Sequence, residues 1–109
     1  MNIGCVIYDK DVQSGSLTAT WFFEDNKKVK GTGIATGVPG KNYSGKYVIV
    51  YIDEYGNKSN KYDLQINNDN GFYTLKWFLN QELKYVGTGM IQGKFLIAGW
   101  KKYKKLPGQ

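Results

Sequence analysis

Residues 87–94, GTGMIQGK, combine closely spaced glycines with a lysine, as phosphate-binding loops do. A P-loop has the pattern G-x-x-x-x-G-K-[ST] and connects a strand to a helix. In this chain Thr88 stands at the first glycine of that pattern, and Phe95 follows the lysine where a metal-binding hydroxyl is needed. The dinucleotide pattern G-x-G-x-x-G also fails, because Gln92 occupies its third glycine. We therefore interpret these glycines as parts of a strand.

Side chains suited to acid–base or nucleophilic catalysis are few. The chain has no His, which is the commonest general base. Three pairs of carboxylates occur, namely Asp9/Asp11, Glu24/Asp25 and Asp53/Glu54. Each pair borders an expected turn, where it is more simply a pair of solvated hairpin residues. Ser14 and Ser16 lie in the stretch QSGS, which is not a nucleophile elbow. We therefore expect a protein that is not an enzyme.

Metal and redox chemistry is restricted in the same way. Cys5 is the single cysteine, so no disulfide can form within the chain. One Cys and no His do not make a zinc or iron–sulfur ligand set. We expect Cys5 to be a small apolar residue of the first strand, and we predict neither a metal site nor a cofactor.

The chain carries a formal net charge of +6, and all its cations are lysines. A basic chain can bind nucleic acid or an anionic surface, but the arginine fork that reads guanine and clamps phosphate is missing. The lysine-rich segment at residues 99–109, GWKKYKKLPGQ, is the candidate for such binding. The simpler interpretation of this segment is a solvated chain terminus. Binding of nucleic acid or an anionic surface therefore ranks third among the functions considered.

Two segments of the chain resemble each other at a fixed spacing. GSLTATWFFEDNKKVKGTGIATG at residues 15–37 aligns with GFYTLKWFLNQELKYVGTGMIQG at residues 71–93. Trp21 then matches Trp77, and the first GTG matches the second. This pattern predicts one domain over residues 1–109, built from two repeat units at about 3–53 and 58–102.

Aromatic residues make up 16% of the chain, and glycines and β-branched residues are frequent, which favours strands. Alternating apolar residues between turn sequences predict eight strands, at about 3–8, 16–24, 28–37, 46–53, 60–67, 72–80, 84–92 and 94–102. No window has the apolar spacing of a long helix. The expected fold is all-β, an eight-stranded antiparallel up-and-down barrel, and a two-sheet β-sandwich is the alternative.

The alternation also predicts which side chains point inward. In the second and third strands the odd-numbered residues form the apolar face, and a three-residue loop between these strands pairs Trp21 with Gly31. The same arrangement in the second repeat pairs Trp77 with Gly87. A large aromatic ring opposite a strand glycine covers the backbone that the glycine leaves bare.

A barrel interior of this composition can hold a small apolar or aromatic ligand, or it can be filled by its own side chains. The candidate ligand-binding residues share an inward position in the strands and are Trp21, Phe23, Gly31, Gly33, Trp77, Tyr85, Gly87 and Gly89.

The fourth and eighth strands, YVIVYI and FLIAGW, are apolar on both faces. One face lies inside a barrel, so the other is either covered or exposed as an association surface. We therefore expect a homodimer or partner interface formed by the candidate residues Tyr47, Ile49, Tyr51, Phe95 and Ile97, or by their even-numbered neighbours.

The strand count, the Trp-bearing hairpins and the closing segments GTG and GKFLIAGW resemble calycin-type barrels, especially the avidin-like and lipocalin-like folds, and small bacterial domains of that shape. The lipocalin signature G-x-W is absent, because Ala19 and Thr20 precede Trp21. The resemblance implies a binding barrel of a kind that often oligomerises. Because the signature is absent, no binding residues of these families are assigned to this chain.

No membrane span and no signal peptide are visible, which predicts a cytoplasmic protein. A secreted or lipoprotein origin is the alternative if the chain is part of a longer one. The leading functional hypothesis is a binding module for a small apolar or aromatic ligand or a protein partner. The alternatives are a filled barrel that associates with itself and a lysine-rich binder of anionic surfaces or nucleic acid.

Overall fold

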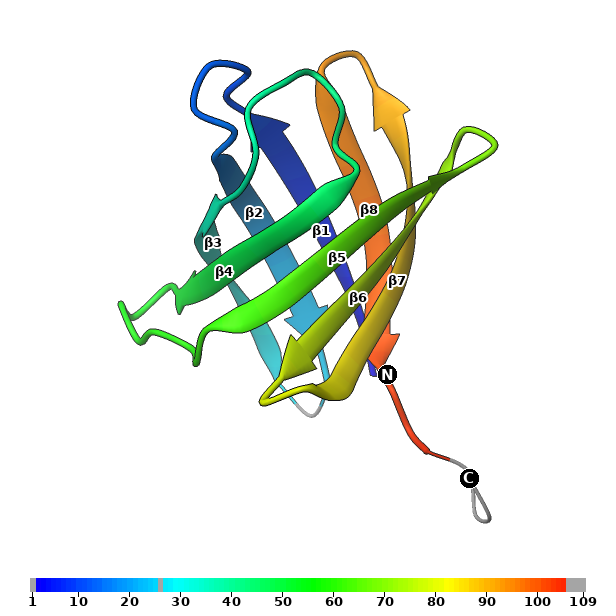
Figure 1. The fold of residues 1–109 in the computed structure, drawn as a ribbon. Coiled ribbons are helices and arrows are strands. Elements are labelled where there is room, and N and C mark those ends of the chain that lie inside the picture. Colours follow the sequence, from blue (N-terminus) through cyan, green and yellow to red (C-terminus); the bar gives the residue numbers. More distant parts are fainter. Residues whose placement is uncertain (1, 26, 106–109) are drawn as a thin grey trace.

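The computed structural model describes residues 2–25 and 27–105 and contains eight antiparallel strands. They are β1 (Ile3–Lys10), β2 (Leu17–Glu24), β3 (Lys28–Thr36), β4 (Gly45–Asp53), β5 (Tyr62–Asp69), β6 (Phe72–Leu79), β7 (Glu82–Gln92) and β8 (Phe95–Lys102). Each strand pairs with its neighbours in sequence, and β8 pairs with β1 to close the barrel (Figure 1). The predicted up-and-down barrel is confirmed, and the sandwich alternative is wrong. The described residues include no helix of the length and apolarity needed to cross a membrane.

The two ends of the barrel carry different connections. The β1–β2 and β3–β4 loops and the β5–β6 and β7–β8 turns lie at one end (Figure 1). The β2–β3 and β6–β7 turns, the β4–β5 loop, the start of β1 and the end of β8 lie at the other end. We call these the loop end and the terminal end.

Alternation of buried inward and exposed outward residues is clear in β1 and in the first half of β2. In β1, Val6 and Tyr8 point inward and are buried, whereas Ile7 between them points outward and is exposed. In β2 the odd-numbered Leu17 and Ala19 are likewise buried. Slipping any strand by one residue would expose its inward side chains, so the burial pattern holds the register.

The first predicted hairpin register is confirmed, since Trp21 pairs with Gly31 across β2 and β3. The second is wrong, because Trp77 pairs with Tyr85 and Gly87 pairs with Leu75.

A tighter turn explains the difference between the two hairpins. Asn80 and Gln81 both have positive φ, 51° and 68°, as the two central residues of a type I′ hairpin turn do. Such a two-residue turn pairs Leu79 with Glu82, which places inward and outward residues opposite each other. An irregularity after Trp77 shifts the register by one residue and brings the inward faces together again. The two hairpins therefore differ in register, and the internal repeat itself stays a prediction.

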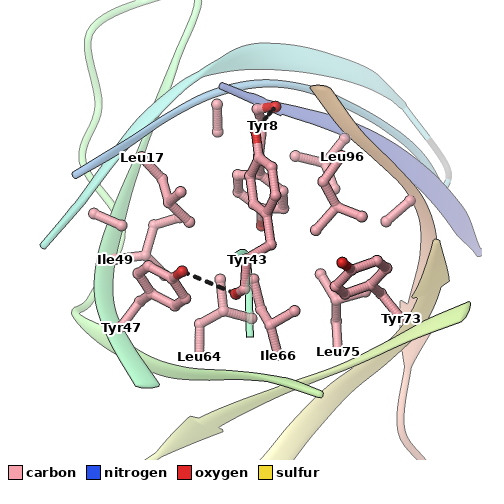
Figure 2. Packing of buried hydrophobic residues seen from close by; sticks show 14 of the residues in the cluster. Tyr8, Leu17, Tyr43, Tyr47, Ile49, Leu64, Ile66, Tyr73, Leu75 and Leu96 are labelled. Carbon is pink, nitrogen blue, oxygen red and sulfur yellow. Dashed lines mark hydrogen bonds between the residues drawn. The ribbon is translucent and has the colours of Figure 1, made fainter. Parts of the chain in front are cut away.

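The loop-end half of the barrel is filled by its own side chains. In Figure 2, Tyr8 and Tyr43 occupy the centre of this half, and aliphatic side chains surround them. We call this set the filled core, and it comprises Tyr8, Leu17, Tyr43, Tyr47, Ile49, Leu64, Ile66, Tyr73, Leu75 and Leu96. Each buried Leu or Ile stabilises the fold by about 1.5–3 kcal/mol relative to an exposed one.

Tyr43, from the β3–β4 loop, closes the loop end of the barrel. Its hydroxyl donates to the carbonyl of Lys94 at 2.7 Å and accepts from the backbone N–H of Lys10 at 3.1 Å. The hydroxyl of Tyr47 donates to the carbonyl of Tyr43 at 2.8 Å, a bond drawn in Figure 2. The loop is thus held to β1, to β4 and to the β7–β8 turn, and Tyr43 covers this end of the filled core.

Candidate functional site: an aromatic cavity at the terminal end

A cavity of about 340 Å³ opens at the terminal end of the barrel. Its residues come from seven strands, β2 to β8, and from the β4–β5 loop. They are Trp21, Phe23, Val29, Tyr51, Asp53, Asn57, Lys58, Ser59, Tyr62, Trp77, Tyr85 and Trp100. The interior of the barrel is therefore half filled and half open.

Six aromatic rings form a continuous series around this cavity, each within 6.5 Å of the next between ring centroids. We call this series the aromatic belt, and in order it runs Trp21, Tyr51, Tyr62, Tyr85, Trp100 and Phe23. Its two end members both belong to β2, so the belt encircles the opening. Trp77 lies on the inner side of the belt, 6.3 Å from Trp100.

The rings of the belt meet in the geometries that aromatic quadrupoles favour. Phe23 and Trp100 are stacked at 4.6 Å with an interplanar angle of 12°. Tyr85 meets Trp100 edge-on at 5.4 Å and 89°. Trp21 meets Tyr51 edge-on at 6.1 Å and 82°. Each such pair adds about 0.5–1.5 kcal/mol beyond the burial of its area, so the wall is pre-formed.

Hydrogen bonds fix two of the indole rings. Trp21 Nε1 donates to the carbonyl of Thr32 at 2.7 Å, and Trp77 Nε1 donates to Tyr51 Oη at 2.7 Å. Tyr51 Oη is also 2.7 Å from Tyr8 Oη, which connects the cavity to the filled core. Burial raises the pKa of Tyr51 and of Tyr8, so both hydroxyls remain neutral at ordinary pH.

Glycines make room for the rings and for the neighbouring strands. A Cβ on Gly4 would collide with the ring of Trp100, its cross-strand partner. A Cβ on Gly31 would collide with the carbonyl of Ile52. A Cβ on Gly87 would lie 3.2 Å from the ring of Trp77, so this ring covers Gly87 diagonally although the two residues are not paired.

The β4–β5 loop forms one side of the cavity mouth. The backbone N–H of Ser59 donates to the carbonyl of Tyr51 at 2.8 Å, and Ser59 Oγ accepts from the N–H of Tyr51 at 3.0 Å. The loop thereby pairs with the last part of β4, beyond the point where β5 pairs with it. This pairing places Asn57, Lys58 and Ser59 at the mouth.

Two charged side chains, Asp53 and Lys58, lie at the mouth. Asp53 accepts from the side chain of Asn57 at 3.0 Å and from the backbone N–H groups of Asn57 and Tyr55 at 2.9 Å each. The bonds from Asn57, and after them the one from Tyr55, lower the pKa of this carboxyl. Asp53 is therefore ionised at neutral pH, and its oxygens are engaged in holding the loop.

Of the predicted ligand-binding residues, Trp21, Phe23, Trp77 and Tyr85 line the cavity. The predicted glycines lie in β3 and β7 and are not among the cavity-lining residues. They are Gly31, Gly33, Gly87 and Gly89, and their lack of a side chain lets neighbouring backbone and rings approach.

Sequence reasoning did not assign Tyr51, Tyr62 and Trp100 to the cavity. The alternation in β8 already placed Trp100 on the same face as the buried Leu96 and Ala98, so this signal was present. The mouth residues of the β4–β5 loop had no comparable signal, because their position depends on hydrogen bonds to β4.

Part of the predicted interface requires correction. Tyr47 and Ile49 are buried in the filled core and Tyr51 lines the cavity, so these three cannot form an outer surface. Because both faces of β4 are apolar, the sequence left these residues and their even-numbered neighbours as alternatives, and the structure places the odd-numbered ones inside. Phe95 and Ile97 do point outward and are exposed.

The candidate lysines after β7 and in the C-terminal segment are not among the cavity-lining residues. The segment GTGMIQGK forms the end of β7 and the turn before β8, where Lys94 pairs with Asp9 at 3.5 Å. Among the described lysines of the C-terminal segment, Lys102 pairs with Asp25 at 3.3 Å. No group of three or more potential metal ligands occurs in the described part of the chain. Comparison of the chain with protein-family models, curated proteins and solved structures gives no match.

Proposed function

We propose that this chain is a non-enzymatic binding module that takes a small apolar or aromatic ligand into the cavity at the terminal end. The aromatic belt around an open cavity is the observation that carries this proposal. A volume of about 340 Å³ lies within the range of small-molecule sites, which are mostly apolar with a few placed polar groups. In a fully filled barrel these rings would pack into the interior, whereas here they surround an open space.

The energetics of the cavity support an apolar ligand. At about 30 Å³ for each water molecule, a cavity of this size holds water on the order of ten molecules. Water beside aromatic walls has few hydrogen-bond partners, so an apolar ligand that displaces it gains affinity. The walls need little reorganisation, which lowers the entropic cost of binding.

The calycin-like resemblance supports the same proposal at the level of architecture. Barrels of eight strands have an interior that is just wide enough for side chains or for one small ligand. Here the filled core takes up one half of the interior, so the ligand is expected to be small and to enter beside the β4–β5 loop. We propose that the chain is a calycin-like binding barrel of this reduced kind.

A blocking substitution tests the proposed site. Val29 lines the cavity from β3, whereas Ile34 is 59% exposed on the outer face of the same strand. We expect Val29→Trp to fill the opening and abolish the binding of indane, measured by isothermal titration calorimetry. Ile34→Trp is the matched control and should bind indane as the natural chain does. Equal binding by both variants, or no binding by the natural chain, would contradict the proposal.

Self-association is a second candidate function, favoured by one outer surface. The outward residues Met90, Ile97, Ile7, Thr20, Thr32 and Ile52 are cross-strand partners in turn from β7 to β4. None of them is charged, and we call them the uncharged row. In a chain of net charge +6, such a surface is where a second copy can approach with the least repulsion.

The second candidate makes its own prediction about mass. We expect sedimentation at micromolar concentration to give a dimer that Ile97→Lys converts to a monomer. The control Asn67→Lys adds the same charge at an exposed position of β5, outside the uncharged row, and should leave the dimer intact. A natural chain that sediments as a monomer would contradict self-association without affecting the proposed ligand site.

A further inference from the structure

The inner end of the cavity carries a hydrogen-bonded group formed by Tyr8, Tyr51 and Trp77. Tyr51 Oη is 2.7 Å from Tyr8 Oη and 2.7 Å from Trp77 Nε1. Tyr51 and Trp77 line the cavity, whereas Tyr8 belongs to the filled core. The group therefore lies at the boundary between the filled and the open halves of the barrel.

The directions of these two bonds follow from the donors present. An indole N–H can only donate, so Trp77 donates to Tyr51. Tyr8 is fully buried, and within the described residues Tyr51 Oη is the hydrogen-bond partner of its hydroxyl. A buried hydroxyl hydrogen that lacks an acceptor is costly. Tyr8 therefore donates to Tyr51 as well.

Tyr51 Oη thus accepts two hydrogen bonds, and its own hydrogen remains available. Burial raises the pKa of Tyr51, and the bonds received from Tyr8 and Trp77 act in the opposite direction. Two accepted bonds polarise the Tyr51 O–H and strengthen it as a donor, and its neutral state keeps the hydrogen in place.

Building on the binding function proposed above, we propose that the ligand is a neutral, planar molecule with a hydrogen-bond acceptor, such as a carbonyl oxygen, at its inner end, which receives a hydrogen bond from Tyr51 Oη. The aromatic belt contacts the apolar part of such a molecule. A cation is disfavoured at the inner end, because the hydroxyl presents the positive end of its dipole there. Tyr51 is a specificity-determining residue in this arrangement.

Three compounds with one bicyclic skeleton separate the relevant ligand classes. Indane has no acceptor, 1-indanone carries a carbonyl oxygen, and 1-aminoindane carries a cation at neutral pH. We expect Tyr51→Phe to weaken 1-indanone about fivefold, as the loss of one neutral hydrogen bond does, and to leave indane within about twofold. Tyr8→Phe should weaken 1-indanone less than Tyr51→Phe does, because Tyr51 keeps its hydrogen and loses only one polarising bond. Tyr55→Phe is the control, because Tyr55 is 82% exposed and does not line the cavity, and it should leave the affinity for 1-indanone within about twofold. Calorimetry on the full chain measures all these affinities.

A spectroscopic measurement on the natural chain needs no variant. We expect the ¹³C NMR signal of the carbonyl carbon of labelled 1-indanone to lie at higher frequency in the bound state than in an apolar solvent, because the carbonyl oxygen accepts a hydrogen bond. Three results would overturn the proposed ligand class but not the binding function. They are an unshifted carbonyl signal, equal losses of affinity for indane and 1-indanone in Tyr51→Phe, and tightest binding of 1-aminoindane. If none of the three compounds binds the natural chain, the proposed binding function fails as well.

Discussion

Trp100 contacts three other aromatic side chains of the site. Its ring stacks on Phe23, meets Tyr85 edge-on and lies 6.3 Å from Trp77. The ring can take this position because Gly4, opposite it on β1, has no side chain. The absence of a Cβ at one position of β1 therefore decides where the Trp100 ring lies.

Substitution of Gly4 tests this dependence. We expect Gly4→Ala to lower the free energy of unfolding by about 1–3 kcal/mol, because the new methyl group collides with Trp100. The same change should weaken indane, since the displaced ring enters the cavity. Gly99→Ala is the control, because a Cβ there lies 3.8 Å from its nearest neighbour. Urea unfolding of the two variants checks this, and equal losses would contradict the account.

Buried tyrosine hydroxyls make the stability sensitive to alkaline pH. Burial, and after it the nearby Tyr43, raises the pKa of Tyr47 from 10.0 to about 12. Between these values the unfolded chain has lost the Tyr47 proton while the folded chain keeps it, so alkali favours unfolding. The contribution of Tyr47 is fully present below pH 10 and is lost as pH rises to about 12.

Unfolding measured across the alkaline range checks this sign. We expect the urea midpoint to fall as pH rises above about 10, and the fall to be shallower in Tyr47→Phe, which has no hydroxyl to titrate. Tyr55→Phe is the control, because Tyr55 is 82% exposed. A midpoint that stays constant through this range, or an equal slope in Tyr47→Phe and the natural chain, is the contrary result.

At the scale of strands and turns, the alternation of apolar residues predicted all eight strands and the β2–β3 register. It failed for β6–β7, where Asn80 and Gln81 adopt positive φ and the strand shifts register after Trp77. Asn80 suits the first position of such a turn, but Gln81 is not the glycine that usually follows, so the local sequence did not identify a two-residue turn. The course of the β4–β5 loop could not be predicted either, because it depends on hydrogen bonds between Ser59 and Tyr51.

The β6–β7 turn supplies a prediction about stability. Gln81 has φ 68°, a conformation that glycine adopts without steric cost, and Asn-Gly is the preferred type I′ sequence. We expect Gln81→Gly to raise the free energy of unfolding by about 0.5–1 kcal/mol. Gln65→Gly, inside β5, should lower it by about the same amount. Chemical unfolding decides, and a loss of stability in Gln81→Gly would argue against the type I′ assignment.

At the scale of the whole molecule, the closed barrel divides into the filled core at the loop end and the aromatic cavity at the terminal end. Residue alternation predicted closure, and it placed Trp21, Trp77 and Tyr85 inside. It could not predict that only one half is filled, because that depends on Tyr43, a loop residue that enters the barrel from outside any strand. The sequence also did not decide which face of β4 points inward, because both faces are apolar, and in the structure Tyr47 and Ile49 belong to the filled core.

The three tryptophans of the chain all line the cavity, so their indole N–H signals in a ¹⁵N–¹H NMR spectrum are direct reporters of ligand entry. We predict that indane shifts the signals of Trp21, Trp77 and Trp100 together and saturably in the natural chain, and leaves them unchanged in Val29→Trp. Indole signals that stay in place at saturating indane, while those of outer-surface residues move, would contradict a ligand site inside the barrel.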